Sequence, residues 1–152
     1  MRAVVQRCRS ARVEVEGAVV GAIDRGLCAF VGAGKGDDEA AAKALIDKIV
    51  LLRIFPDEQG KMSRSLIDSG GALLLVSQFT LYGDTRKGRR PSFEGALEPA
   101  LAAPLLDRAA DLARAHGVQV ETGRFGADMR VFVENDGPVT ILLATPGDSG
   151  PG

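Results

Sequence analysis

Apolar and polar residues alternate in short blocks over the first third of the chain, and this pattern predicts β-strands. Val13–Glu16 alternates apolar and charged side chains, as a strand with one buried face does. Gly17 offers a turn, after which Ala18–Ile23 is expected to return antiparallel. The apolar run Leu27–Val31, which follows a second turn at Asp24–Gly26, has the pattern of a buried strand. We therefore predict a β-meander for this third.

Two longer segments carry the period of amphipathic helices. The first begins at the acidic run Asp37–Glu39 and is expected to end near Phe55-Pro56, because the residue before a proline disfavours helical backbone. The second runs from about Pro99 to His116 and stops at Gly117. Apolar side chains recur at helical spacing on both: Leu45, Ile49 and Leu52 on the first, and Leu101, Leu105, Ala109 and Leu112 on the second.

The remaining apolar segments are predicted to complete a single sheet. Leu73–Leu81 is expected to be a central strand, since it is apolar almost throughout until Ser77 and Gln78. Polar residues 61–71 and the Gly- and Arg-rich residues 83–96 are expected to be loops. Three closing strands are predicted at Val118–Glu121, Arg130–Glu134 and Val139–Ala144.

These elements predict an α+β fold, with a mostly antiparallel, barrel-like sheet flanked by two main helices. At 152 residues the chain has the length of one domain, and it is long enough to bury a core without disulfides or a metal. We assign residues 1–144 to the domain. The Pro-, Gly- and Ser-rich residues 145–152 are expected to be a flexible tail.

The charge and hydropathy of the chain exclude some classes of protein. Nineteen basic and twenty acidic residues give a net charge of −1, which excludes a globally basic nucleic-acid binder but leaves room for a local basic patch. The apolar runs are far shorter than the roughly 20 residues that span a bilayer. Arg7, Arg9 and Arg12 interrupt the N-terminal region, so it lacks the apolar core of a signal peptide. We expect a cytoplasmic protein.

The sequence lacks the residue spacing that is typical of metal sites, nucleotide-binding loops and catalytic triads. Cys8 and Cys28 form no CxxC pair and are expected to be small buried apolar residues. The loop Gly32–Gly36 matches neither the Walker nor the dinucleotide pattern, so it is interpreted as a flexible turn. The single histidine, His116, is expected to cap a helix rather than act in a triad. We predict no metal and no cofactor.

Three other segments carry possible chemistry. Arg86, Lys87, Arg89 and Arg90 place four cations in five residues, which is typical either of a solvated surface or of a phosphate-contacting patch. The segment Ser77-Gln78-Phe79-Thr80-Leu81 puts hydroxyls and an amide at the end of an apolar strand, where they could line a pocket. The segment Asn135-Asp136-Gly137-Pro138-Val139-Thr140 is expected to form a turn between two strands, and composition alone allows a plain hairpin.

The last two segments resemble the SQxTL and NxGPxT motifs of the D-aminoacyl-tRNA deacylase family. The opening Met1–Arg7, the stretch Lys87–Phe93 and the stretch Phe125–Met129 also look like family segments in the family order. The resemblance covers residues 1 to about 143. It implies a homodimeric cytoplasmic enzyme that hydrolyses the ester between a D-amino acid and tRNA, and that also acts on glycyl-tRNA.

The resemblance also implies roles for the motif residues. Gly137 and Pro138 would form a cis peptide that enters the partner subunit's active site, where backbone carbonyls would occupy the space an L side chain needs. The neighbouring motif residues Asn135 and Val139 are expected to belong to the same substrate-binding element. Arg7 is implied to hold this element in place. A rigid obstacle on one face of the α-carbon would reject L substrates and admit glycine.

The chemistry is open between two routes. Thr80 is a candidate nucleophile by its place in the motif, but no base is evident beside it. We favour a route in which the backbone amides around Gln78 and Phe79 hold the substrate while the ribose 2′-hydroxyl assists attack by water. Ser77 is then expected to position the substrate.

The acceptor end of tRNA is single-stranded, so we expect stacking and phosphate contacts. Phe79 could stack on the adenine or fill the core, and the four cations of residues 86–90 could contact phosphates. Two alternatives stay open: a non-catalytic RNA-binding dimer, and a Thr80-dependent hydrolase of small esters.

Overall fold

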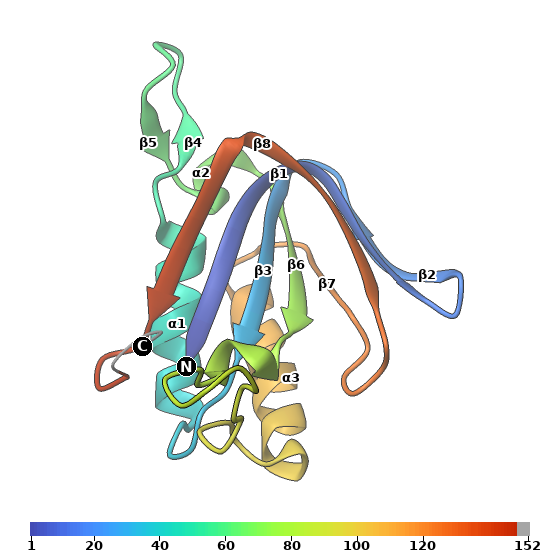
Figure 1. Cartoon of the computed structure of the whole chain (residues 1–152). Coiled ribbons are helices and arrows are strands. Elements are labelled where there is room, and N and C mark those ends of the chain that lie inside the picture. Colours follow the sequence, from blue (N-terminus) through green and yellow to red (C-terminus); the bar gives the residue numbers. More distant parts are fainter. Residues whose placement is uncertain (149–152) are drawn as a thin grey trace.

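The computed structural model describes residues 1–148 and contains one six-stranded mixed sheet with helices packed on one side (Figure 1). The strands of this sheet are β1 (Arg2–Val15), β2 (Ala18–Ile23), β3 (Gly26–Gly32), β6 (Ala72–Ser77), β7 (Val120–Thr122) and β8 (Arg130–Ala144). The helices are α1 (Glu39–Leu51), α2 (Leu66–Ser69) and α3 (Pro99–Ala115), with one 3-10 turn, η1 (Phe79–Tyr82). A two-stranded hairpin of β4 (Phe55–Pro56) and β5 (Met62–Arg64) stands apart from the main sheet.

Strand β1 is the centre of the sheet. The order is β2-β1-β3-β6-β7, and β8 pairs with the other edge of β1 over nearly its whole length. The contacts of β1 are antiparallel, whereas β3–β6 and β6–β7 are parallel. A Cβ on Gly21 of β2 would lie 2.3 Å from the Thr122 carbonyl oxygen of β7, so the two ends of the sheet approach closely. The expected α+β, barrel-like sheet with two main helices is confirmed.

The strongly apolar strands are explained by burial on both faces. Leu73 and Leu75 of β6 pack toward α1 and α3, while Leu74 and Val76 point into a second core inside the curved sheet. Strand β3 divides in the same way, with Leu27, Ala29 and Val31 facing the helices and Cys28 facing inward. The two helices therefore cover one face only, and the sheet closes over the other.

Both predicted main helices are present. Asp38 caps α1 by accepting a hydrogen bond from the Ala41 amide at 3.0 Å. This helix ends at Leu51, earlier than predicted, because Phe55 and Pro56 leave it to form β4. Helix α3 has the predicted bounds, with Pro99 as its first residue and His116 as its C-cap. None of the helices in residues 1–148 is both long enough and apolar enough to cross a membrane.

Two strand predictions were wrong in extent, and one predicted loop contains regular structure. The first strand begins at Arg2, well before Val13. The strand predicted over Leu73–Leu81 ends at Ser77, because Gln78 turns away and its amide donates to the Val31 carbonyl at 2.8 Å. Residues 61–71, predicted as loop, contain β5 and α2.

The segment predicted as a turn between two closing strands is no hairpin. Residues on both sides of it pair with the same strand, Thr140 with Gln6 and Asn135 with Cys8, so β8 is one strand interrupted by a bulge. After β8 the chain turns back onto the N-terminus, where the Thr145 amide donates to the Met1 carbonyl at 2.9 Å. The remainder of the predicted tail, residues 149–152, lies outside the described residues.

Candidate active site

The polar end of strand β6 leads directly into the 3-10 turn η1. Ser77 pairs with Val31 of the parallel strand β3, and the chain then turns at Gln78. A Cβ on Gly32 would lie 2.7 Å from the Gln78 carbonyl oxygen, so only glycine lets β3 approach this turn so closely. Phe79, the first residue of η1, is left 58% exposed. The backbone thus places Ser77 to Thr80 together at one end of the sheet.

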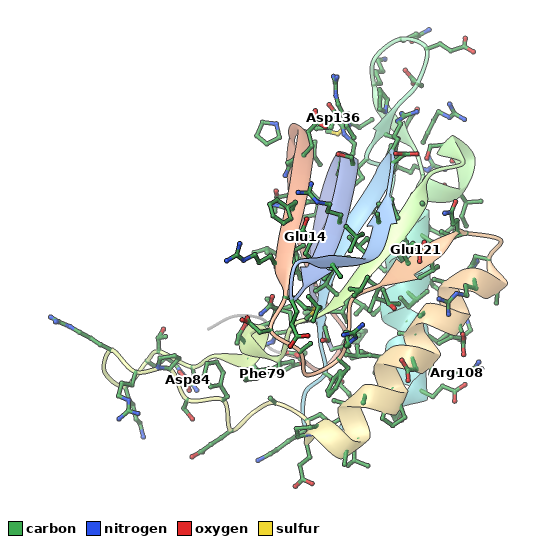
Figure 2. The ribbon with its side chains drawn as sticks, turned by 90° about the vertical axis from the view of Figure 1, so that its right-hand side faces the viewer. Glu14, Phe79, Asp84, Arg108, Glu121 and Asp136 are labelled. Atoms are coloured by element: carbon green, nitrogen blue, oxygen red, sulfur yellow. The ribbon has the colours of Figure 1, made fainter. Side chains whose placement is uncertain are left out.

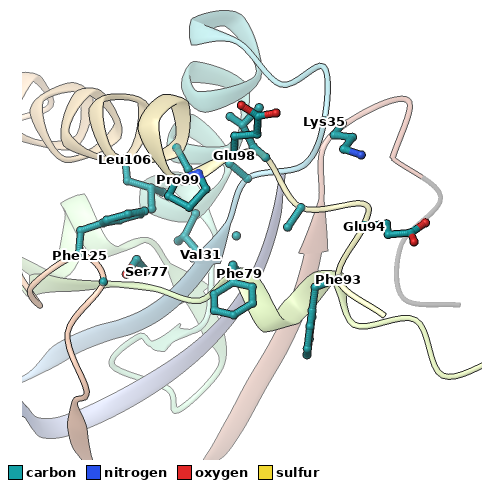
Figure 3. A pocket seen from close by; sticks show the side chains of 16 residues that line it. Val31, Lys35, Ser77, Phe79, Phe93, Glu94, Glu98, Pro99, Leu106 and Phe125 are labelled. Atoms are coloured by element: carbon teal, nitrogen blue, oxygen red, sulfur yellow. The ribbon is translucent and has the colours of Figure 1, made fainter. Parts of the chain in front are cut away.

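Phe79 separates two cavities. The larger, which we call the aromatic pocket, has a volume of about 480 Å³ and lies between η1, the loop after β3 and the start of α3 (Figure 3). Its apolar wall includes Val31, Leu97, Pro99, Leu106 and three phenylalanines, Phe79, Phe93 and Phe125. The smaller cavity, about 240 Å³, is lined by Ser77, Gln78, Phe79, Met129 and Val131, among others. An apolar, aromatic-lined pocket of this size suits a flat ring system.

Aromatic contact links the pocket to the following loop. The ring centroids of Phe79 and Phe93 are 5.2 Å apart in an edge-to-face arrangement, a geometry that stabilises aromatic pairs. In Figure 3 the ring of Phe79 lies between Phe125 and Phe93. Sequence reasoning did not select Phe93 or Phe125 as site residues, although both lie in stretches that resemble the family.

The environment of Thr80 does not favour a nucleophile. Its hydroxyl accepts a short hydrogen bond from the Gln78 side-chain amide, and an amide is no base at neutral pH. The single histidine, His116, lies at the end of α3, where its Nε2 is 2.8 Å from an Asp47 oxygen. It is therefore not available as a base at η1.

One of the two predicted backbone donors is already engaged. The Gln78 amide donates to Val31, and the first hydrogen bond within η1 is donated by Leu81 to the Gln78 carbonyl at 3.2 Å. The amide of Phe79 precedes that bond, as the first amides of any helical turn do. Of the predicted pair, Phe79 is thus the one whose N–H donates no hydrogen bond within η1.

The four predicted phosphate-binding cations lie in an exposed loop after η1. Asp84 and Ser92 pair through two backbone hydrogen bonds and close this loop at its base. Arg86 is engaged by Asp84 at 2.7 Å, and this contact keeps the pKa of the Asp84 carboxyl well below its usual value. The other three cations, Lys87, Arg89 and Arg90, form no ion pair among residues 1–148. The loop therefore presents unpaired positive charge on the segment that joins η1 to Phe93 of the aromatic pocket.

The remaining predicted residues form a separate element, which we call the Gly-Pro bulge (residues 135–140). The Gly137-Pro138 peptide is cis and exposed. Arg7 donates from Nε to the Asp136 carbonyl at 2.9 Å, and from a terminal nitrogen to the Ile54 carbonyl at 2.6 Å. Arg7 therefore ties the bulge to the residue that precedes the β4–β5 hairpin.

The structure does not bring the Gly-Pro bulge to η1 within one chain. Asp136 and Phe79 lie at opposite ends of the sheet (Figure 2). Strand β1 reaches both, since Arg2 donates to the Leu81 carbonyl at 3.0 Å and Arg7 holds the bulge. These two arginines are five positions apart on an extended strand, roughly 16 Å.

No group of three or more His, Cys, Asp or Glu side chains that could bind a metal is found in residues 1–148. Cys8 and Cys28 are both fully buried free thiols. Burial raises the pKa of Cys8 to about 11 and that of Cys28 to about 12. Protonated, buried thiols are poor nucleophiles, so neither cysteine contributes to this site.

Proteins of known name are similar to this chain in sequence. The chain is 64% identical over 144 residues to a D-aminoacyl-tRNA deacylase of Sorangium cellulosum, covering 94% of this chain and 96% of that protein. A D-aminoacyl-tRNA deacylase of Myxococcus xanthus is 53% identical over 151 residues, 99% of both chains.

Solved structures share the fold. One described as c-Myc DNA unwinding element binding protein is 39% identical, with a TM-score of 0.90 over 96% of this chain and 99% of that one. A structure described as a probable eukaryotic D-amino acid tRNA deacylase has a TM-score of 0.80 at 20% identity, over 93% and 97% of the two chains. The profile of the family described as D-Tyr-tRNA(Tyr) deacylase matches residues 4–144. The chain therefore belongs to the D-aminoacyl-tRNA deacylase family.

Proposed function

We propose that this protein is a hydrolase that cleaves the ester between a D-amino acid, or glycine, and the 3′-terminal adenosine of tRNA. Family membership over residues 4–144 is the observation that carries this proposal. The products are the free amino acid and deacylated tRNA. Because the substrate is tRNA, we place the enzyme in the cytoplasm.

The aromatic pocket is the proposed site of the terminal adenosine. Its phenylalanine-lined wall offers a surface on which a base can stack, as unpaired RNA bases do on protein aromatic rings. The cations Lys87, Arg89 and Arg90 follow η1 and are proposed to contact the acceptor phosphates. A contact confined to the acceptor end fits a chain whose net charge is only −1.

The ester carbonyl is proposed to lie at the start of η1. The Phe79 amide donates to the developing oxyanion, and Ser77 positions the substrate. The ribose 2′-hydroxyl assists a water molecule whose oxygen attacks the carbonyl carbon. The bond to the ribose 3′-oxygen then breaks, and that oxygen takes up the proton that the water loses. Thr80 holds the Gln78 side chain and is not covalently modified.

Chiral selection is assigned to Gly137 and Pro138 acting in the active site of a second copy. The distance between the Gly-Pro bulge and η1 in one chain supports a homodimer in which each subunit completes its partner's site. Leu142, which follows the bulge on β8, is 63% exposed and offers an apolar side chain for that contact. Backbone carbonyls at Gly137 then occupy the space of an L side chain, whereas a D side chain or glycine meets no obstacle.

The direct test follows ester loss from D-tyrosyl-tRNA, L-tyrosyl-tRNA and glycyl-tRNA with purified protein. We expect rapid loss of the D and glycyl esters while the L ester persists. Hydrolysis of both tyrosyl esters would retain the esterase and remove the chiral role of Gly137. Hydrolysis of none, with tRNA binding intact, would favour the non-catalytic RNA-binding dimer.

The Thr80-dependent esterase is tested separately. It requires that a serine-directed covalent inhibitor label the protein and that simple amino acid esters be hydrolysed as fast as tRNA esters. We expect neither, because Thr80 contacts an amide and no base.

A further inference from the structure

The C-terminal end of η1 is held by a group of charged side chains around Tyr82, together with the chain's N-terminal ammonium. This group consists of the Met1 ammonium, Arg2, Asp37, Tyr82 and Asp148, which we call the charge cluster. The ammonium contacts Asp37 at 2.8 Å, and Arg2 contacts Asp148 at 2.9 Å. Two cations and two carboxylates thus balance, with side chains no more than 15% exposed. None of these five residues was among those that the sequence selected for the site.

Tyr82 lies at the centre of this cluster. Its hydroxyl donates to an Asp148 oxygen at 2.6 Å and lies 3.3 Å from Asp37. The Arg2 guanidinium stacks over the Tyr82 ring at 4.4 Å. A Cβ on Gly34 would lie 2.5 Å from the ring, so the loop after β3 needs glycine there to admit the tyrosine. Burial and the nearby carboxylates raise the pKa of Tyr82 above its usual value, which keeps the phenol a donor.

The cluster holds both elements that frame the aromatic pocket. Tyr82 is the last residue of η1, and Arg2 also donates to the Leu81 carbonyl at 3.0 Å, so that turn is held at its C-terminal end. Asp37 accepts from the Gly34 amide at 2.6 Å and fixes the loop that contributes Ala33 to the pocket wall. A shift of the cluster would therefore move η1 and the loop together.

Asp148 reaches the cluster from outside the region that defines the family. The family profile ends at residue 144, and β8 ends there as well. The chain continues through Thr145, which is buried and whose hydroxyl accepts from the Met1 ammonium at 2.6 Å. This contact directs the chain back to η1 and brings Asp148 to Tyr82.

We propose that Tyr82 and Asp148 are positioning residues for deacylation, and that their hydrogen bond fixes η1 so that the Phe79 amide meets the ester carbonyl. The inference rests on the proposed function and deepens it, because it makes the segment after β8 part of the active-site support. Neither residue contacts substrate. Their effect is transmitted through the backbone of η1.

The test compares Tyr82→Phe, Asp148→Asn and the double variant on D-tyrosyl-tRNA. Tyr82→Phe keeps the ring that packs on Gly34 and removes only the hydroxyl. We expect each single variant to lower kcat at least tenfold while KM changes less than twofold. The double variant should be no worse than the more affected single variant by more than twofold, since both act on one bond: Tyr82→Phe removes its donor, and Asp148→Asn exchanges its carboxylate acceptor for a neutral amide. Asp47→Asn, which loses an ion pair with Lys43 on α1, is the control and should leave kcat unchanged.

Hydrogen exchange of the peptide spanning residues 77–82 gives a readout that needs no activity. We expect faster exchange in Tyr82→Phe and Asp148→Asn than in wild type, and no change in Asp47→Asn. Single variants with kcat within twofold of wild type, or with unchanged exchange, overturn the positioning role. If wild type deacylates no D-aminoacyl-tRNA, the proposed function fails, and the exchange data alone then decide whether the cluster holds η1.

Discussion

The side-chain oxygen of Asn135 accepts a hydrogen bond from the backbone amide of Val139 at 2.8 Å, closing a ring around Asp136, Gly137 and Pro138. The Asn135 amide nitrogen in turn donates to the Thr140 hydroxyl at 3.0 Å. The first residue of the motif therefore braces the Gly-Pro bulge from within. Both of these hydrogen bonds of the Asn135 side chain lie within the bulge itself.

We expect Asn135→Ala to relax chiral selection. The variant leaves the partly buried Val139 amide without its acceptor, which costs about 1–3 kcal/mol and loosens the bulge. The ratio of D- to L-tyrosyl-tRNA hydrolysis should fall about tenfold, while the rate on the D ester falls less than threefold. Deacylation assays on both esters measure this. Glu134→Gln, an exposed neighbour on β8, is the matched control, and an unchanged ratio in Asn135→Ala would contradict the bracing role.

Thr80→Val is expected to retain most activity. The substitution removes the hydroxyl that accepts from Gln78 but no base or acid, so kcat should stay within about fivefold of wild type. A tRNA ending in 2′-deoxyadenosine should instead lose at least about 100-fold, because the assisting hydroxyl is absent. Single-turnover kinetics with both substrates separate the two routes. Loss of activity in Thr80→Val, with the deoxy substrate still active, would restore the covalent mechanism.

The basic loop should govern the salt dependence of tRNA binding. Replacing Arg89 and Arg90 by alanine removes two cations that form no ion pair among residues 1–148, so it should weaken binding without changing the fold. If each contacts one phosphate, the slope of log K against log salt falls by about 1.4–1.8. Binding titrations at several salt concentrations give this slope. Arg108→Ala, on the exposed face of α3, should leave the slope as it is.

Stability should fall at alkaline pH because of Cys8 and Cys28. Their pKa values are raised from 9.0 in the unfolded chain to about 11 and about 12, so the unfolded thiols ionise first as the pH rises. At pH values between the unfolded and the native pKa of each thiol, the native state binds more protons than the unfolded state does, so the free energy of unfolding decreases as the pH rises. By pH 10 each thiol has lowered the free energy of unfolding by about 1.4 kcal/mol.

Urea unfolding at pH 8 and pH 10 measures the effect of the thiols. The variant carrying both Cys8→Ala and Cys28→Ala should show a smaller difference between the two pH values than wild type does. Native protein at pH 8 should also resist thiol-specific reagents that label it fully once unfolded. Rapid labelling of the native state would show that the thiols are not buried as described.

The helices were predictable because their signals are local. Asp38 is a good cap, and the apolar period of α1 and α3 lies within a few turns of each segment. The end of β6 was not predictable from the sequence, because Leu81 and Tyr82 continue its apolar pattern. The strand stops earlier because the chain turns at Gln78, against Val31 and Gly32 of β3. Contacts between distant segments decide where that strand stops.

The two motifs could be located in the sequence, but not the elements that support them. Asn-Asp-Gly-Pro is typical of a hairpin turn, and only the pairing of both flanks with β1 shows that it is a bulge. The loop Gly32–Gly36 was interpreted as flexible, whereas Gly32 and Gly34 are required by the close approach of Gln78 and Tyr82. Such requirements arise from packing partners far away in the chain.

Strand β1 sets the separation between the proposed chiral filter and η1, because Arg2 and Arg7 of this one strand hold the two ends. The number of residues between these two arginines therefore fixes the distance between the proposed chiral filter and η1. Deleting one residue between these arginines would shorten it by about 3.3 Å and turn every later side chain to the opposite face. In a symmetric dimer the same error would enter both active sites at once, so the N-terminal strand should tolerate substitutions far better than changes in its length.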